Sequence, residues 1–229
     1  MTRDKSTVNP RVWVRYEFLY TAFLQFVEYV KVNKCPLDFF SFHCYDDVKN
    51  GVKHIAFVRK TLDDAGFKDT EMSLNEWLPS TGAGETGSAK QAAFVAAMIA
   101  GMQNTGVIDD SEIYDARCGM GTYSPLFHPV TLEPRLPYYA LFAFNELYKR
   151  KYAVATSGAP EDVWVTAAKG PRDGAVYIAN TTGKDVPLSF DFGGKKPVSC
   201  KIVDEAHTYE DVELPAVLPK DSFLLIIVK

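Results

Sequence analysis

The sequence predicts an α/β fold followed by an all-β part. Strand-like and helix-like segments alternate over residues 1–153, and parallel strands need crossover helices, so this part predicts a parallel sheet. Residues 154–229 contain short apolar runs separated by turn residues, which is typical of a small antiparallel β-sandwich. A (β/α)8 barrel needs roughly 250 residues. Residues 1–153 therefore hold about four βα units, either as a small open sheet or as the C-terminal half of a barrel.

The N-terminal segments alternate between β-branched, aromatic and amphipathic patterns. The β-branched piece Arg11–Arg15 predicts a short strand, and Tyr16–Asn33 predicts a helix whose polar residues form only a narrow stripe. We therefore expect this helix to be buried on more than one side. The apolar run Leu37–Tyr45 predicts a strand covered on both faces. A helix with an apolar stripe follows, and Gly66 is well placed as its left-handed cap.

Capping and turn residues set the next elements. Glu71–Trp77 predicts a strand, and a glycine-rich loop follows it. Ser88–Gln91 fits a capping box, which predicts a helix running to about Asn104. Ser111–Arg117 predicts a further strand. The last helix of this part begins near Pro137, because the fixed φ of proline suits a first helical turn.

The all-β part consists of short strands divided by turns. Alternation of apolar and polar residues indicates one buried face, and glycines mark the hairpin turns. The predicted strands are Val163–Thr166, Ala175–Ala179, Leu188–Phe192, Val198–Val203 and Phe223–Val228.

Composition excludes several classes of partner. The net charge is -4 without a basic block, so nucleic acid is not expected to bind. No apolar stretch reaches the ~20 residues of a membrane-spanning helix, and the N-terminus lacks a signal-peptide pattern. The 4 cysteines are far apart with no C-x-x-C, which argues against a zinc or redox motif and favours isolated, mostly buried thiols. We expect no metal and no cofactor.

Polar and aromatic residues gather where the predicted strands end. In parallel α/β sheets functional side chains lie at this C-terminal edge. His43 and Tyr45 close one strand, and Asn75-Glu76-Trp77 closes the next. A third strand ends with Asp115 and Arg117. A carboxylate, an imidazole and flat aromatic faces together are typical of a sugar site, where a carboxylate serves as nucleophile or acid.

Each of these residues has a structural alternative. Glu76 fits a solvated loop residue or the partner of a nearby arginine, and His43 fits a hydrogen-bonded core histidine. Asp115 and Arg117 are spaced to pair with each other as well as to contact a substrate.

The ordered set Pro36–Tyr45, Ser73–Trp77, Ile113–Arg117 and Pro137–Phe144 resembles the back half of a retaining glycoside hydrolase with a (β/α)8 barrel. It is most similar to family 39, the β-xylosidase and α-iduronidase group. The resemblance implies a carbohydrate substrate and a small β-sandwich after the barrel. It implies that Glu76 is the nucleophile. His43 and Tyr45 would orient Glu76 or a sugar hydroxyl, and Trp77 would line the pocket. Members of the family are often secreted or periplasmic.

Three departures from the family limit what this chain is expected to do alone. The family's acid/base glutamate, in an Asn-Glu-Pro-like motif on the fourth strand, has no counterpart here, so we expect a poorly active fragment that carries the nucleophile half of the site. Leu78 replaces a frequent asparagine after Trp77, and Asp115 occupies a strand often marked by tryptophan. The alternatives are a non-catalytic carbohydrate-binding or scaffold protein, and an unrelated open α/β domain.

A half barrel also has a consequence for association. It leaves unpaired strand edges and an apolar interior in contact with water. We therefore expect the chain to associate with a second copy or with a missing N-terminal barrel half.

Overall fold

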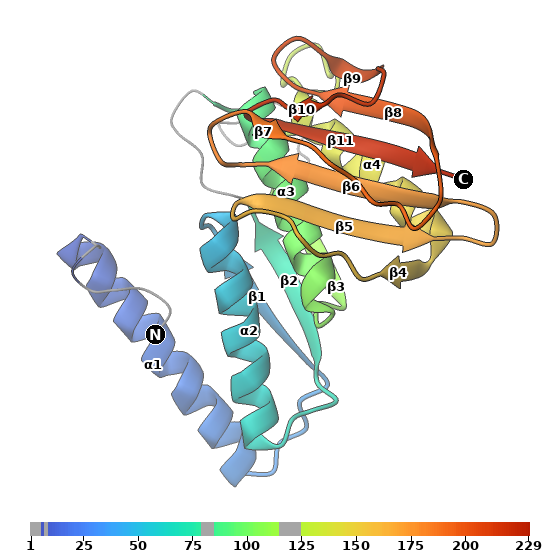
Figure 1. Cartoon of the computed structure of the whole chain (residues 1–229). Coiled ribbons are helices and arrows are strands. Elements are labelled where there is room, and N and C mark those ends of the chain that lie inside the picture. The colour runs from blue at the N-terminus through green and yellow to red at the C-terminus, as the bar shows by residue number, and fades with distance from the viewer. Residues whose placement is uncertain (1–5, 7–8, 79–84, 115–124) are drawn as a thin grey trace.

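A computed structural model describes residues 6, 9–78, 85–114 and 125–229 (Figure 1). A parallel sheet with its helices comes first, and a mainly antiparallel part follows it. The first part comprises α1 (Pro10–Val32), β1 (Phe39–Cys44), α2 (Val48–Ala65), β2 (Glu71–Trp77), α3 (Ala89–Thr105), β3 (Asp110–Ile113) and α4 (Leu136–Arg150). The second comprises β4 (Tyr152–Val154), β5 (Val163–Lys169), β6 (Gly174–Asn180), β7 (Val186–Pro187), β8 (Pro197–Val203), β9 (Thr208–Asp211), β10 (Val217–Leu218) and β11 (Ser222–Val228).

The N-terminal sheet is parallel, as the alternating pattern predicts. Its strand order is β1-β2-β3, and both pairs run parallel with α2 and α3 as crossovers. Ser73 of β2 aligns with Ser41 of β1 and with Asp110 of β3. The register between β1 and β2 is irregular after Ser41, and this irregularity places His43 opposite Glu76.

The predicted strand at Arg11–Arg15 is wrong, because these residues form the first turns of α1. The side chain of Asn9 caps the helix by accepting a hydrogen bond from the Arg11 amide at 3.0 Å, and Pro10 occupies the first turn. This start signal outweighs the weak strand preference of valine and tryptophan.

The expected burial of α1 on more than one side is also wrong. Its buried residues Trp13, Val27 and Val30 lie on one face, and α1 packs on α2, with the Phe23 ring 5.0 Å from that of Phe40 on β1. Phe18 and Tyr29 are exposed. No helix among the described residues has both the length and the apolar character needed to cross a membrane.

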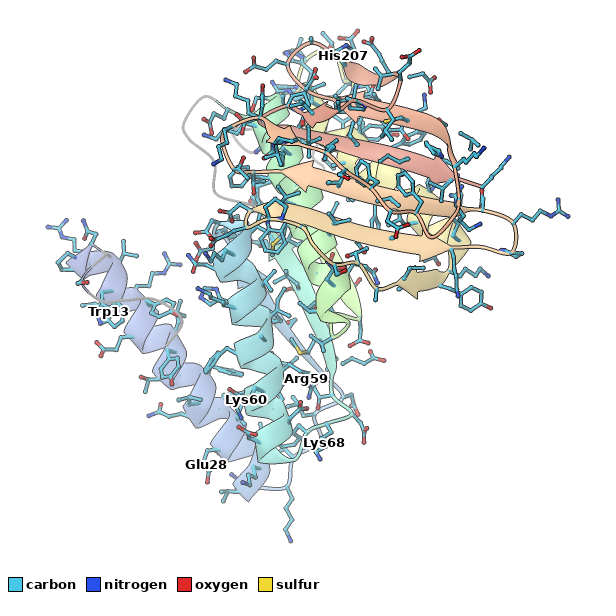
Figure 2. All side chains as sticks on the ribbon, viewed as in Figure 1. Trp13, Glu28, Arg59, Lys60, Lys68 and His207 are labelled. Atoms are coloured by element: carbon cyan, nitrogen blue, oxygen red, sulfur yellow. The ribbon has the colours of Figure 1, made fainter. Side chains whose placement is uncertain are left out.

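Helix α2 has the predicted cap and a firm connection to β2. Gly66 ends the helix with a φ of +99°, a conformation that glycine adopts without strain. Arg59 donates hydrogen bonds to the carbonyl oxygens of Thr70 (2.7 Å) and Phe67 (2.5 Å), so its guanidinium ties α2 to the segment before β2 (Figure 2).

Helix α3 lies at the centre of the molecule, between the two sheets (Figure 1). The Ser88 side chain accepts from the Gln91 amide at 3.2 Å, and the Gln91 side chain accepts from the Gly87 amide at 2.6 Å, which confirms a box-like cap. Gly101 allows close packing, since a Cβ there would lie 2.8 Å from a methyl carbon of Val52. Most of the buried residues of α3 belong to one hydrophobic core shared with β2, α4 and β6.

The C-terminal part has a 6-stranded antiparallel sheet of order β4-β5-β6-β11-β8-β9, and a 2-stranded ladder of β7 and β10. One face of the large sheet packs on α3 and α4, where buried Tyr177 donates to the carbonyl oxygen of Ala140 at 2.9 Å. A second apolar cluster covers the other face. The predicted strand Leu188–Phe192 is wrong: Phe190 and Phe192 stack at 5.1 Å in an irregular segment after β7. Beyond Pro187 the Leu188 amide still donates to the Ala216 carbonyl oxygen at 2.9 Å, and the Asp191 side chain then accepts from the Gly193 amide at 2.8 Å, a local turn contact that competes with strand pairing.

Candidate functional site

Glu76 lies at the C-terminal end of β2 and is held by two side chains from β1 and the residue after it. The Tyr45 hydroxyl donates a hydrogen bond to Oε1 of Glu76 at 2.5 Å. Nδ1 of His43 lies 3.4 Å from the same oxygen. The side chain of Glu76 is 30% exposed and that of His43 is 54% exposed. The carboxylate is therefore oriented and still accessible.

The parallel topology explains why these residues meet. Parallel strands end at one edge of the sheet, so residues at the ends of β1, β2 and β3 converge. The irregular register after Ser41 aligns His43 with Glu76, and Tyr45 follows β1 directly. The Tyr45 ring makes an edge contact with Tyr114, which follows β3, at 5.9 Å between centroids. Sequence reasoning did not assign Tyr114 a role, because the strand predicted over Ser111–Arg117 placed it inside the strand; β3 instead ends at Ile113, so Tyr114 lies at the strand end.

Glu76 makes few polar contacts with the described part of the chain. Among residues 6, 9–78, 85–114 and 125–229, its one ion-pair contact is with His43, and Oε2 accepts no hydrogen bond. The alternative in which Glu76 pairs with an arginine does not hold for these residues. A neutral O–H donor on one oxygen orients the carboxylate while leaving the second oxygen open to an incoming atom.

A row of polar residues supports the site from within the sheet. Ser73 donates to a carboxylate oxygen of Asp110 at 2.9 Å, and Asp109 accepts from the Met72 amide at 2.8 Å. These contacts join β2 to the β3 segment three and four residues before Glu76. They limit movement of the strand that carries Glu76.

The remaining predicted site residues have different environments. Trp77 is fully buried in the hydrophobic core, and neither its Nε1 nor Oδ1 of Asn75 has a hydrogen-bond partner in the described part of the chain. Their roles toward a substrate stay predictions. Asp115 and Arg117 lie outside the described residues. Within the described ranges, no three His, Cys, Asp or Glu side chains come together as a metal site.

No protein-family model matches this sequence, and no curated protein matches it either. Solved structures do match. A glucosidase from Croceicoccus marinus has a TM-score of 0.69 at 18% identity over 90% of this chain and 57% of its own. A GH39 β-xylosidase from Caulobacter crescentus has a TM-score of 0.62 at 15% identity over 90% of this chain and 54% of its own. A GH30 endoxylanase from Clostridium papyrosolvens has a TM-score of 0.57 at 17% identity over 83% and 48%.

These neighbours define the class of fold. The chain has an α/β fold similar to that of glycoside hydrolases, and it spans about half the length of the structures it matches. The low identities show similarity of fold alone.

Proposed function

We propose that this chain carries the nucleophile half of a retaining glycoside hydrolase site, with Glu76 as the nucleophile. The observation that carries the proposal is the Tyr45–Glu76 hydrogen bond at the C-terminal edge of a parallel sheet. A glutamate held there by the Tyr45 hydroxyl is placed to attack a sugar bound over the strand ends. The glycosidase-like fold supports this reading.

The chemistry requires a second carboxyl group. Glu76 attacks the anomeric carbon and forms a glycosyl–enzyme ester, while the bond to the leaving oxygen breaks and an acid protonates that oxygen. Water, deprotonated by the same group, then hydrolyses the ester and releases Glu76. The two carboxyl groups stand about 5 Å apart in retaining enzymes. The family's acid/base motif has no counterpart in this sequence, so we assign the acid/base to another polypeptide segment.

The finer assignment follows the sequence motifs. The order of His43, Tyr45 and the Asn75-Glu76-Trp77 motif favours family 39, and a GH39 β-xylosidase is among the structural neighbours. We further propose that β1–β3 and α1–α4 are the C-terminal half of a (β/α)8 barrel, with domain limits of 1–153 and 154–229. The C-terminal domain is then the β-sandwich of such enzymes.

An activated substrate tests the role of Glu76 without the acid. A dinitrophenolate leaving group departs without protonation, so it bypasses general-acid help worth about 10²–10⁴ in rate. We expect the chain to hydrolyse a dinitrophenyl xyloside or glucoside slowly, and to hydrolyse the unsubstituted phenyl glycoside undetectably. Glu76→Gln removes the nucleophile and abolishes the reaction.

Glu71→Gln is the matched control, because Glu71 lies on the same strand at its opposite end and is exposed. It should leave the rate unchanged. Equal losses in the two variants, or hydrolysis that survives Glu76→Gln, contradict the proposal. Sugar binding by calorimetry without any turnover would instead support the non-catalytic scaffold.

A further inference from the structure

Helix α1 carries a second apolar stripe that the described chain leaves uncovered. Successive residues of a helix are about 100° apart around its axis. The four residues of this stripe therefore fall within one arc, away from both the buried face and the polar stripe. Their exposed fractions range from 42% to 68%. They are Phe18, Leu19, Phe26 and Tyr29. Figure 1 shows α1 beside α2, with no further described helix or strand along its other side.

This apolar stripe continues onto an open strand edge. The Phe26 ring lies 5.9 Å from that of Phe40 on β1, and Phe40 stacks on Phe42 at 6.1 Å. Strand β1 pairs with β2 on one side only, so in the described chain its other edge is open. Unpaired strand edges and contiguous exposed apolar side chains are both typical of binding surfaces.

The geometry distinguishes between two occupants. A second copy related by a two-fold axis would pair β1 with β1 in antiparallel fashion. Parallel sheets, in contrast, occur with further βα units and with helices over their outer face. The structural neighbours also contain about as much chain again beyond the part matched here, since this chain covers 57% and 54% of two of them.

We infer that the stripe of α1 and the open edge of β1 form one docking surface for a polypeptide of parallel βα units, the amino-terminal half of the same fold. This partner places a strand parallel to β1 and packs a helix against Leu19 and Tyr29.

Charge on the open face of the sheet agrees with such a partner. Strands β1, β2 and β3 contain Glu71, Glu76, Asp110 and Glu112 and no lysine or arginine. An apolar interior was expected here, but Ser41, His43 and Ser73 make much of this face polar. The partner therefore brings basic or hydrogen-bond donor groups to it. The docking surface stands on its own observations, whereas the expectation that the partner carries the acid/base carboxylate rests on the proposed function.

The test uses the full chain and a defined probe. The probe is the part of the Croceicoccus marinus glucosidase that this chain leaves uncovered, produced as a separate polypeptide. Analytical ultracentrifugation should show a 1:1 complex, and hydrogen exchange should slow at residues 39–44. Leu19→Lys and Tyr29→Lys, both at exposed positions, should each weaken binding at least about tenfold by burying a charge in the interface. Gln25→Lys on the polar stripe is the control and should bind normally.

Two results would overturn the inference. The first is a probe that binds the glucosidase's own remaining half but does not bind this chain. The second is a discrete homodimer that protects residues 39–44, which would assign the surface to a second copy. A complex that forms without Glu76-dependent hydrolysis would refute the proposed function and leave the docking surface intact. Glu76-dependent hydrolysis by a chain that forms no complex would refute the docking surface and leave the proposed function intact.

Discussion

The Tyr45 hydroxyl donates to Oε1 of Glu76 across two neighbouring parallel strands, at 2.5 Å. This contact fixes the direction of the carboxylate without cancelling its charge. It joins residues separated by 31 positions in the sequence. The parallel register that aligns His43 with Glu76 is what makes it possible.

Tyr45→Phe removes this hydrogen bond and keeps the ring. A hydrogen bond to a charged group is worth about 1.5–3 kcal/mol, so hydrolysis of a dinitrophenyl glycoside should slow roughly 10- to 100-fold. Steady-state kinetics should place the loss in kcat more than in KM, because the contact orients the proposed nucleophile. Tyr148→Phe, at an exposed position on α4, should have no effect. An unchanged kcat for Tyr45→Phe would refute this orienting role.

Gly101→Ala should destabilise the chain despite the better helix propensity of alanine. The new methyl would lie 2.8 Å from a methyl of Val52, with the Trp164 ring at 3.4 Å on the same side. Valine is stiff at χ1 and cannot move away cheaply. Overpacking of this kind costs about 1–3 kcal/mol, which denaturant unfolding can measure. Gln103→Ala, at an exposed position of α3, should change stability little.

Glu146 gives the fold a defined acid dependence. A hydrogen bond from Lys149, and after it one from Arg150, lowers the pKa of this carboxyl below its usual 4.5. A lowered folded-state pKa means that the stabilisation is present above about pH 4.5 and is lost as the pH falls through the lowered value. Glu146→Gln should therefore reduce stability at pH 7, and the difference from the parent should vanish in acid. A difference that persists unchanged at low pH would contradict this linkage.

The described cysteines should differ in reactivity. Burial, and secondarily the charge of Asp211, raises the pKa of the Cys200 thiol to about 11. At pH 8 only about one thiol in a thousand is then ionised. Cys35 is partly exposed, whereas Cys44 and Cys200 are buried. Peptide mapping after iodoacetamide treatment should find Cys35 modified well before these two, and early modification of Cys200 would show that β8 opens locally.

The sequence predicted best those features that depend on residues close together in the chain, such as helix caps and strand ends. Capping residues such as Ser88 and Gly66 predicted helix ends correctly, and Glu71–Trp77 matches β2 residue for residue. Strand ends also selected His43 and Tyr45, which the structure brings to Glu76.

Sequence patterns gave a wrong prediction where two local signals compete. They gave none where a contact depends on how distant segments pair. At Arg11–Arg15 the cap at Asn9 prevailed over β-branched residues. The register shift after Ser41, and the contact of Tyr114 with Tyr45, depend on strand pairing and could not be predicted from spacing. The exposure of α1 follows from which neighbours are present, a property that no helical pattern encodes.

Covalent trapping tests the central claim most directly. A dinitrophenyl 2-deoxy-2-fluoro glycoside slows the second step of a retaining reaction, so the glycosyl–enzyme ester accumulates. Peptide mass spectrometry should find one sugar on the peptide that contains Glu76, and none in Glu76→Gln. A sugar attached to a different carboxylate, or none on the parent chain with xylose and glucose reagents alike, would contradict the assignment of Glu76 as the nucleophile.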